Sequence, residues 1–196
     1  MNEDRHQQRQ QRLKEQVDAR IASATDVRGI VMVFTGNGKG KTTAAFGTAL
    51  RACGHGKRVG AIQFIKGEWP NGERNILEQH GVEFQVMSTG FTWETQNRQA
   101  DTDACLEVWQ HAKRMLADSS LDLVILDEIT YMVSMDYLPL EALLTALRQR
   151  PSQQSVIITG LGCHRSITEL ADTVTEMRPV KHAFDTGIQA QQGIDW

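Results

Sequence analysis

Thr35-Gly36-Asn37-Gly38-Lys39-Gly40-Lys41-Thr42-Thr43 is the stretch of sequence that determines the fold. It follows a continuous apolar run at residues 30–34, which is typical of a buried strand. It precedes residues 43–53, in which Phe46, Leu50 and Cys53 recur at helical spacing. A strand, a glycine-rich turn, a lysine with a following hydroxyl and a helix, in that order, are the arrangement of a phosphate-binding loop.

The residue types of this loop suit a polyphosphate ligand. Glycines let backbone N–H groups approach phosphate oxygens, and the start of a helix adds unpaired donors and partial positive charge. Lys41 supplies a full charge, and the Thr42 hydroxyl can ligate a magnesium ion held on the phosphates. The strict pattern has glycine where this chain has Thr35, so we expect a cradle of altered shape. The alternative, a solvent-exposed turn, is disfavoured by the flanking strand and helix. The residues expected to bind the nucleotide here are Gly36, Asn37, Gly38, Lys39, Gly40, Lys41, Thr42 and Thr43.

The length and composition of the chain indicate a single globular domain. The chain has 196 residues, 40% of them hydrophobic, and a net charge of −3, which is not the strongly basic balance of a nucleic-acid-binding surface. Neither a membrane-length apolar run nor a secretory signal is visible, so we expect a cytoplasmic protein. Cys53, Cys105 and Cys163 lie far apart and suit buried or incidental thiols rather than a zinc site.

Residues 1–27 differ in composition from the remainder of the chain. Gln, Arg, Glu and Asp dominate, yet Leu13, Val17 and Ile21 recur every four residues. One narrow apolar stripe is too little to fold alone. We therefore expect either a solvated tail or a mobile helix that docks as a lid on a partner subunit or an active site, preceding a domain at residues 28–196.

Strands and helices alternate through that domain. This alternation predicts an α/β fold like that of the phosphate-loop NTPases, with a mostly parallel sheet covered by helices on both faces. Beyond the loop, the expected strands are at residues 58–65, 82–87, 121–126, 155–160 and 173–177. The expected helices are at residues 73–81, 101–118, 139–150 and 167–171. Asp101 and Asp103 are expected to favour the start of the second of these helices. Its expected apolar stripe, in which Trp109 is assigned to the core, is Leu106, Trp109, Ala112 and Leu116.

Two acidic residues, Asp127 and Glu128, end the apolar run of the expected strand at residues 121–126. Acidic side chains are not easily buried unpaired, and phosphate-loop proteins place the magnesium-side carboxylate here. One of the pair can instead cap the next helix. We expect Thr42, Asp127 and Glu128 to hold the metal ion.

Two predicted loops carry candidate ligand contacts. Glu68 follows the second strand, at the carboxyl end of the sheet where ligands bind in such folds. Phe91 and Trp93 lie in a Gly/Thr-rich loop, where they either tuck into the domain or form an apolar wall for a flat, bulky ligand. The residues alone thus indicate a protein that binds a nucleoside triphosphate with magnesium, without deciding the reaction.

A longer stretch, Gly36 to Gly47, resembles the opening motif of the ATP:corrinoid adenosyltransferases of the CobA/CobO/BtuR type. The likeness covers residues 28–196. Leu161 departs from it, since the family often has arginine there, although Arg165 is nearby. The other segments that fit, in the same order, are Gly90-Phe91-Thr92-Trp93, Asp127-Glu128, residues 169–172, residues 175–185, Gly187, Ala190, Gln191 and Gly193-Ile194-Asp195.

The resemblance implies transfer of the 5′-deoxyadenosyl group of ATP to the cobalt(I) of a corrinoid, with release of triphosphate. It implies catalytic roles for Lys41, Thr42 and Glu128, and a magnesium or manganese ion. Phe91 and Trp93 would pack under the corrin ring and exclude its lower axial ligand. It also implies a homodimer and an electron-donor protein such as a flavodoxin. A small-molecule kinase and an ATP-dependent cofactor-binding module are the alternatives.

Overall fold

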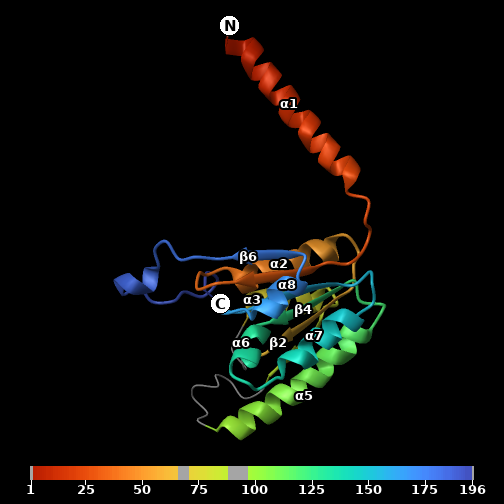
Figure 1. Ribbon diagram of the computed structural model, residues 1–196. Helices are drawn as coiled ribbons and strands as arrows, with labels where there is room; N and C mark the ends of the chain where they lie inside the picture. The colour runs from red at the N-terminus through yellow and green to blue at the C-terminus, as the bar shows by residue number, and fades with distance from the viewer. Residues whose placement is uncertain (1, 66–70, 88–96, 196) are drawn as a thin grey trace.

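A six-stranded sheet forms the centre of the computed structural model, which describes residues 2–65, 71–87 and 97–195 (Figure 1). The strand order is β3-β2-β4-β5-β1-β6, and every neighbouring pair is parallel. The predicted α/β fold is confirmed, with strand ends shifted by up to two residues. The strands are β1 (Val31–Thr35), β2 (Val59–Gln63), β3 (Glu83–Val86), β4 (Leu123–Asp127), β5 (Ser155–Thr159) and β6 (Thr173–Glu176).

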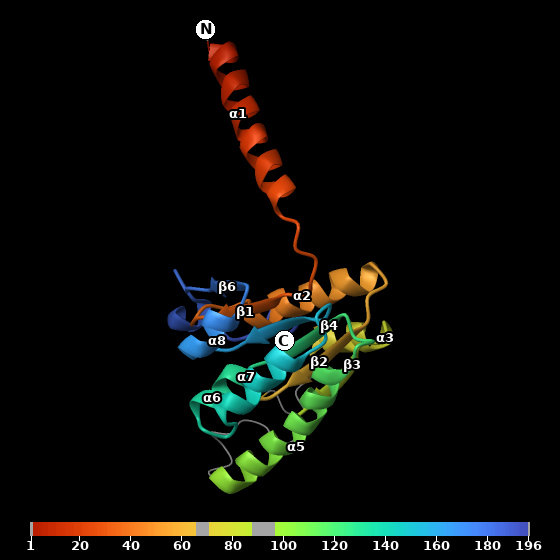
Figure 2. The ribbon, with the colours of Figure 1, turned by 45° about the vertical axis from the view of Figure 1, so that its right-hand side comes forward.

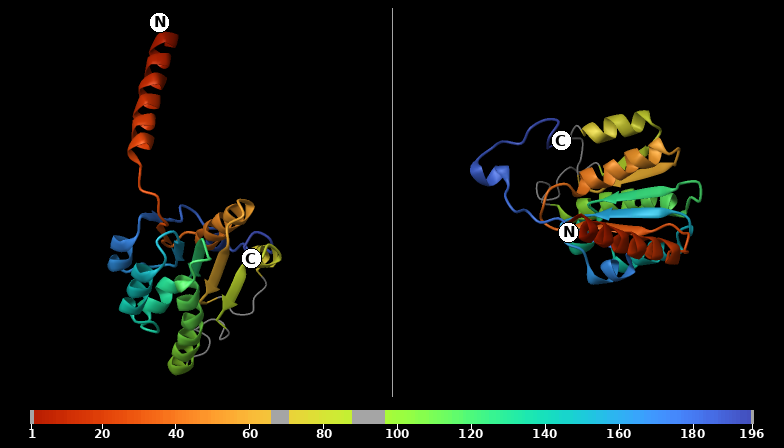
Figure 3. Two further views of the ribbon diagram at one scale, coloured as in Figure 1. Left: turned by 90° about the vertical axis from the view of Figure 1, so that its right-hand side faces the viewer. Right: turned by 90° about the horizontal axis from the view of Figure 1, so that it is seen from above.

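Helices cover both faces of the sheet (Figures 2 and 3). One face packs on α2 (Lys41–Gly54) and α3 (Gly72–Gln79). The other packs on α5 (Arg98–Ala117), α6 (Ile129–Ser134), α7 (Leu140–Gln149) and α8 (Arg165–Leu170). The central strand β4 is buried at all five positions, as a strand covered on both faces must be. The short α6 was not predicted from the sequence.

The buried faces of two helices differ from those predicted. In α2 the residues against the sheet are Ala45, Phe46 and Ala49, whereas Leu50 is 51% exposed. Small side chains bring this helix close to the sheet, and Leu50 falls outside the contact. In α5, Leu106 is likewise exposed, while Trp109 is in the core as expected.

The start of α5 also differs from the prediction. Asn97, rather than an aspartate, caps this helix, and its side chain accepts a hydrogen bond from Ala100 N at 3.2 Å. Asp101 lies within the first turn, where it is buried and its charge suits the helix dipole. The helix therefore begins several residues earlier than expected.

The N-terminal helix α1 (Asn2–Ser23) projects away from the body of the protein (Figures 1 and 2). Leu13, Val17 and Ile21, its predicted apolar stripe, are 54%, 45% and 67% exposed. None of the described helices combines the length and apolarity needed to span a bilayer.

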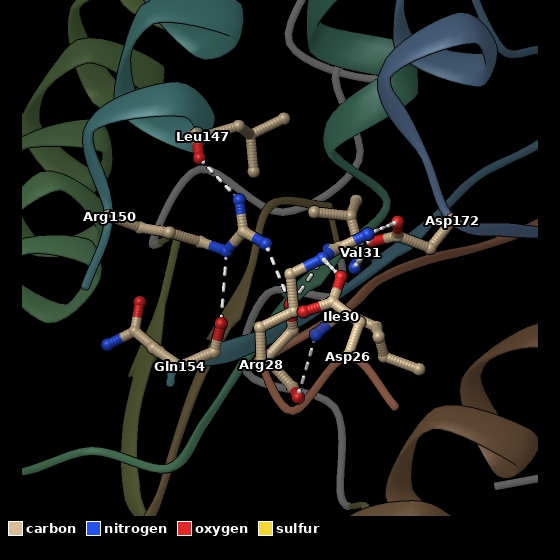
Figure 4. A network of polar contacts seen from close by, with 10 residues as sticks. Asp26, Arg28, Ile30, Val31, Leu147, Arg150, Gln154 and Asp172 are labelled. Atoms are coloured by element: carbon tan, nitrogen blue, oxygen red, sulfur yellow. Dashed lines mark hydrogen bonds and ion pairs between the residues drawn. The ribbon is translucent and has the colours of Figure 1, made fainter. Parts of the chain in front are cut away.

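A polar network fixes the chain where it enters β1, at the amino end of the sheet (Figure 4). Arg28 forms a bidentate ion pair with Asp172, and Asp172 also accepts from Val31 N at 2.9 Å. Arg150 donates to Gly29 O at 3.3 Å. The Arg28 guanidinium lowers the pKa of Asp172 to about 2. The link between α1 and the sheet is thus anchored on the side away from the phosphate loop.

Candidate functional site

The phosphate loop joins β1 to α2 at the carboxyl end of the sheet. Gly40, the residue before α2, has φ +106°, and Gly36 has φ +97°, so both need the freedom of glycine. Lys41 opens the helix, is only 9% exposed, and donates from its ammonium to Gly38 O at 3.0 Å. The N–H groups of the first turn of α2 have no intrahelical acceptor and favour an anion at the same place.

Two glycines of the loop also pack against the chain that follows β6. A Cβ at Gly36 would lie 2.4 Å from Met177 O, and one at Gly38 would lie 2.8 Å from Met177 C. Gly38 N donates to Met177 O at 2.8 Å, and Gly36 N donates to Leu161 O at 3.1 Å. These two amides are engaged within the protein here, so their close packing, and not phosphate contact alone, requires glycine. Their role toward a nucleotide stays a prediction.

Thr35 occupies the position where the strict loop pattern has glycine. Its hydroxyl donates to Leu161 O at 3.2 Å, which ties the loop to the end of β5. The contribution of Leu161 is therefore a backbone carbonyl, and its side chain is 50% exposed. The Arg165 side chain is 88% exposed and pairs with Glu169 at 2.7 Å, so its described ion pair lies within α8.

Asp127, at the end of β4, contacts Thr42, the residue with which it was predicted to hold a metal ion; the metal itself stays a prediction. Its carboxylate is fully buried and accepts from Thr42 Oγ1 at 3.0 Å. It also accepts from Thr159 Oγ1 at 2.7 Å and from Gln63 Nε2 at 3.1 Å. Thr159 and Gln63 were not among the predicted site residues. Their signal in the sequence is a polar side chain at the last position of an otherwise apolar strand.

Glu128 follows Asp127 in a left-handed conformation, with φ +63°. It precedes α6, but its side chain makes no capping hydrogen bond. Its N–H donates to Thr159 Oγ1 at 2.8 Å, and the residue borders the cavity beside the phosphate loop. This left-handed backbone is a strained conformation of the kind found at functional sites, and it lies where the residue borders the cavity.

A cavity of about 430 Å³ lies between the loop, the start of α3, Glu128 and the C-terminal segment. One side is polar, formed by the loop from Lys39 to Thr43. The other side is formed by residues of the C-terminal segment, for which the sequence showed no periodicity. Lys39 pairs with Asp195 across the cavity edge, and this contact lowers the pKa of the Asp195 carboxyl. Glu68, Phe91 and Trp93 lie outside the described residues.

The oxygen donors beside the loop fit a hard divalent cation. The Thr42 hydroxyl and the Asp127 carboxylate touch, and Glu128 borders the same cavity. Such all-oxygen donors suit magnesium or manganese. In the described part of the chain no three His, Cys, Asp or Glu side chains form a cage of their own, so phosphate oxygens would complete the shell.

Comparison with known proteins gives consistent matches along the chain. Residues 27–196 match the family described as ATP:corrinoid adenosyltransferase BtuR/CobO/CobP, and residues 1–21 match the family described as Cob(I)alamin adenosyltransferase N terminal. The corrinoid adenosyltransferase of Escherichia coli K12 is 75% identical over 196 residues, covering 100% of both chains. Corrinoid adenosyltransferase CobA of Salmonella typhimurium LT2 is 71% identical, again over 100% of both chains. The corrinoid adenosyltransferase of Pseudomonas aeruginosa PAO1 is 46% identical over 98% of this chain and 96% of its own.

Proposed function

This chain belongs to the BtuR/CobO/CobP family of ATP:corrinoid adenosyltransferases and transfers the adenosyl group of ATP to a corrinoid; from that premise we propose how its residues do so. The observation that carries the proposal is the contact of Thr42 with buried Asp127, directly under the phosphate loop and beside the cavity. This arrangement suits a triphosphate held by the loop together with a divalent cation.

In the proposed reaction, cobalt(I) attacks the 5′ carbon of the ribose and the whole triphosphate leaves. One cobalt–carbon bond forms, one carbon–oxygen bond breaks, and the bonding pair goes to the triphosphate. Negative charge therefore grows on the leaving group. Lys41 and the first-turn amides of α2 stabilise that charge in the transition state. No side chain need act as a general base, because the attacking cobalt carries no proton.

Thr42, with one or both of Asp127 and Glu128, would hold the magnesium or manganese ion, and Asp127 would also orient Thr42. The bound ion supplies positive charge that neutralises the departing triphosphate. Within the described part of the chain, the Asp127 carboxylate already accepts hydrogen bonds from two hydroxyls and one amide side chain. It is thus suited to fix the direction of the Thr42 oxygen, while Glu128 faces the cavity.

The loop grips the triphosphate, we propose, in an orientation different from that in a kinase. The bond that breaks is at the ribose end of the chain, whereas a kinase breaks the bond at the γ-phosphate. The altered first position, Thr35, and the engaged amides of Gly36 and Gly38 support a cradle of different shape. A complex with the γ-phosphate placed as in kinases would contradict this proposal.

Several parts of the proposal concern residues or partners beyond this cavity. Phe91 and Trp93 are proposed to pack under the corrin ring, and Glu68 to contact a ligand. Residues 1–27 are proposed as a lid over the corrinoid, preceding the catalytic domain at 28–196; the exposed stripe of α1 supports a docking role. We further propose a cytoplasmic homodimer that receives electrons from a protein such as a flavodoxin.

Anaerobic incubation with magnesium, ATP and chemically reduced cobalamin tests the reaction. We expect an adenosylated corrinoid, recognised by its light-sensitive alkylcobalt spectrum, and free triphosphate in equal molar amounts. ADP as the product would favour a small-molecule kinase, and neither product would favour a cofactor-binding module.

The same assay tests the role of Lys41. Lys41→Met removes a charged donor, so kcat/KM should fall by about tenfold to a hundredfold. Lys57→Met is the matched control, because Lys57 pairs with Asp122 at the opposite end of the sheet. Equal losses in both variants would reject the proposed role.

A further inference from the structure

The C-terminal segment, residues 182–195, encloses one side of the cavity. After β6 the chain extends away from the sheet through the 3₁₀ helix η1 (Ala183–Thr186) and then returns toward α3 (Figures 1 and 3). Both the outgoing and the returning parts line the cavity, through residues near 183 and near 194. The segment therefore acts as a wall that faces the phosphate loop.

The segment is tied to the loop by the Lys39–Asp195 ion pair. The other oxygen of Asp195 accepts from Gln191 N at 2.8 Å, and Asp195 N donates to Gln191 O at 2.8 Å. Asp195 thus closes the final turn of the segment and, through the ion pair with Lys39, also links that turn to the phosphate loop. Its side chain is 22% exposed, compared with 53% for Lys39.

The side chains on the wall are chemically unlike those of the loop. Phe184, Ile188 and Ile194 border the cavity, and they are 75%, 50% and 76% exposed. Large apolar groups beside a cavity, left uncovered by the chain itself, indicate an apolar portion of a ligand. With the polyphosphate on the loop, the apolar part of the same nucleotide is its nucleoside.

We propose that Asp195 is a positioning residue that holds segment 182–195 against the nucleoside of ATP. The inference rests on the function proposed above. Lys39 has three donor hydrogens, so its ammonium can serve Asp195 and a phosphate oxygen together. The ion pair then sets the wall at the distance that the nucleoside needs, while Asp195 itself touches neither the base nor the ribose.

This role predicts opposite effects on two ligands. Asp195→Asn removes a negative charge beside the polyphosphate, so inorganic triphosphate should bind as well as before or more tightly. ATP should bind more weakly, because the loosened wall no longer packs on its nucleoside. A half-exposed ion pair accounts for a twofold to fivefold change in the dissociation constant, about 0.4–1 kcal/mol. A purely electrostatic role would shift both ligands in the same direction.

Isothermal titration calorimetry on the full chain, with magnesium–ATP and with magnesium–triphosphate, measures the ratio of the two dissociation constants. We expect Asp195→Asn to raise the ATP-to-triphosphate ratio at least twofold. Asp185→Asn is the matched control: it removes the same charge from an exposed residue of η1 that does not line the cavity, and it should leave the ratio unchanged. An unchanged ratio in Asp195→Asn, or an equal change in Asp185→Asn, would overturn the inference.

Ile188→Ser tests the wall without touching the ion pair. It should weaken ATP binding and leave triphosphate binding unchanged; unchanged binding of both ligands would overturn the inference. Measurements on the wild-type chain distinguish a failure of the proposed function from a failure of the role of Asp195 alone. If it binds neither ligand, the proposed function fails as well, whereas normal binding and adenosylation with an unaltered ratio in Asp195→Asn rejects only the role of Asp195.

Discussion

Replacing Thr159 by valine removes one buried hydroxyl and keeps nearly the same side-chain volume. Thr159 is fully buried at the end of β5, and its Oγ1 makes two hydrogen bonds. It donates to Asp127 Oδ1 at 2.7 Å and accepts from Glu128 N at 2.8 Å. The substitution therefore deprives a buried carboxylate of a donor and leaves an amide N–H without its acceptor.

The magnitude follows from those two bonds. A hydrogen bond to a charged group contributes about 1.5–3 kcal/mol, and an unsatisfied buried donor costs about 1–3 kcal/mol. The two effects overlap, so we expect a loss of about 3 kcal/mol in the free energy of unfolding. For a chain of this size, that corresponds to a fall of about 6–12 °C in Tm. Because Asp127 orients Thr42 and the same hydroxyl holds Glu128, the affinity for magnesium with ATP should fall about tenfold or more.

Calorimetric unfolding without ligand and a magnesium titration at saturating ATP measure the two effects. Thr48→Val is the control, since among the described residues the Thr48 hydroxyl bonds to Ala44 O within α2 alone, at 2.9 Å. Its loss should change the free energy of unfolding by no more than about 0.5 kcal/mol. If Thr159→Val matches Thr48→Val in both measurements, the hydroxyl does not organise the acidic pair, and the reasoning is refuted.

Two further predictions concern stability. Gly36→Ala would place a Cβ 2.4 Å from Met177 O at φ +97°, so the free energy of unfolding measured in urea should fall by about 2 kcal/mol or more. Gly47→Ala is the control, because Gly47 lies on an exposed face of α2 with nothing within 4 Å, and it should raise the free energy of unfolding by about 0.5–1 kcal/mol. Equal effects of the two substitutions would contradict the packing described for the loop. The pKa of Asp172 is lowered to about 2 by Arg28, so its contribution to stability is complete above about pH 4 and is lost as the pH falls toward 2. Asp172→Asn should flatten the fall in stability between pH 4 and pH 2 relative to the parent chain, and an identical fall in both would show that the pair does not stabilise the fold.

The phosphate loop was predictable because its requirements are local. Glycine, lysine and threonine at fixed spacing, between an apolar run and a helical pattern, specify chemistry within ten residues. The contact of Thr42 with Asp127 also followed, since parallel strands place their carboxyl ends at one edge of the sheet. Trp109 was predicted to lie in the core for a similar reason, because its helical spacing matched its neighbours.

Features that depend on distant segments could not be predicted in this way. The exposure of Leu50 is decided by how closely Ala45 and Ala49 approach the sheet, which periodicity alone does not report. The role of Thr159 depends on β5 lying next to β4. The C-terminal segment has no repeating pattern, because its apolar residues face a cavity rather than a helix-packing surface.

The position of β6 has a consequence for the order in which this protein becomes competent during synthesis. The loop is made early in translation, yet β1 is flanked by β6, and Gly36 and Gly38 rest on Met177, close to the end of the chain. A nascent polypeptide thus contains the complete nucleotide-binding motif long before the residues that pack against this motif have been synthesised. Ribosome-bound chains arrested before residue 177 should therefore not bind ATP. Binding should appear in a single late step, once the last segment has been synthesised and released from the ribosome.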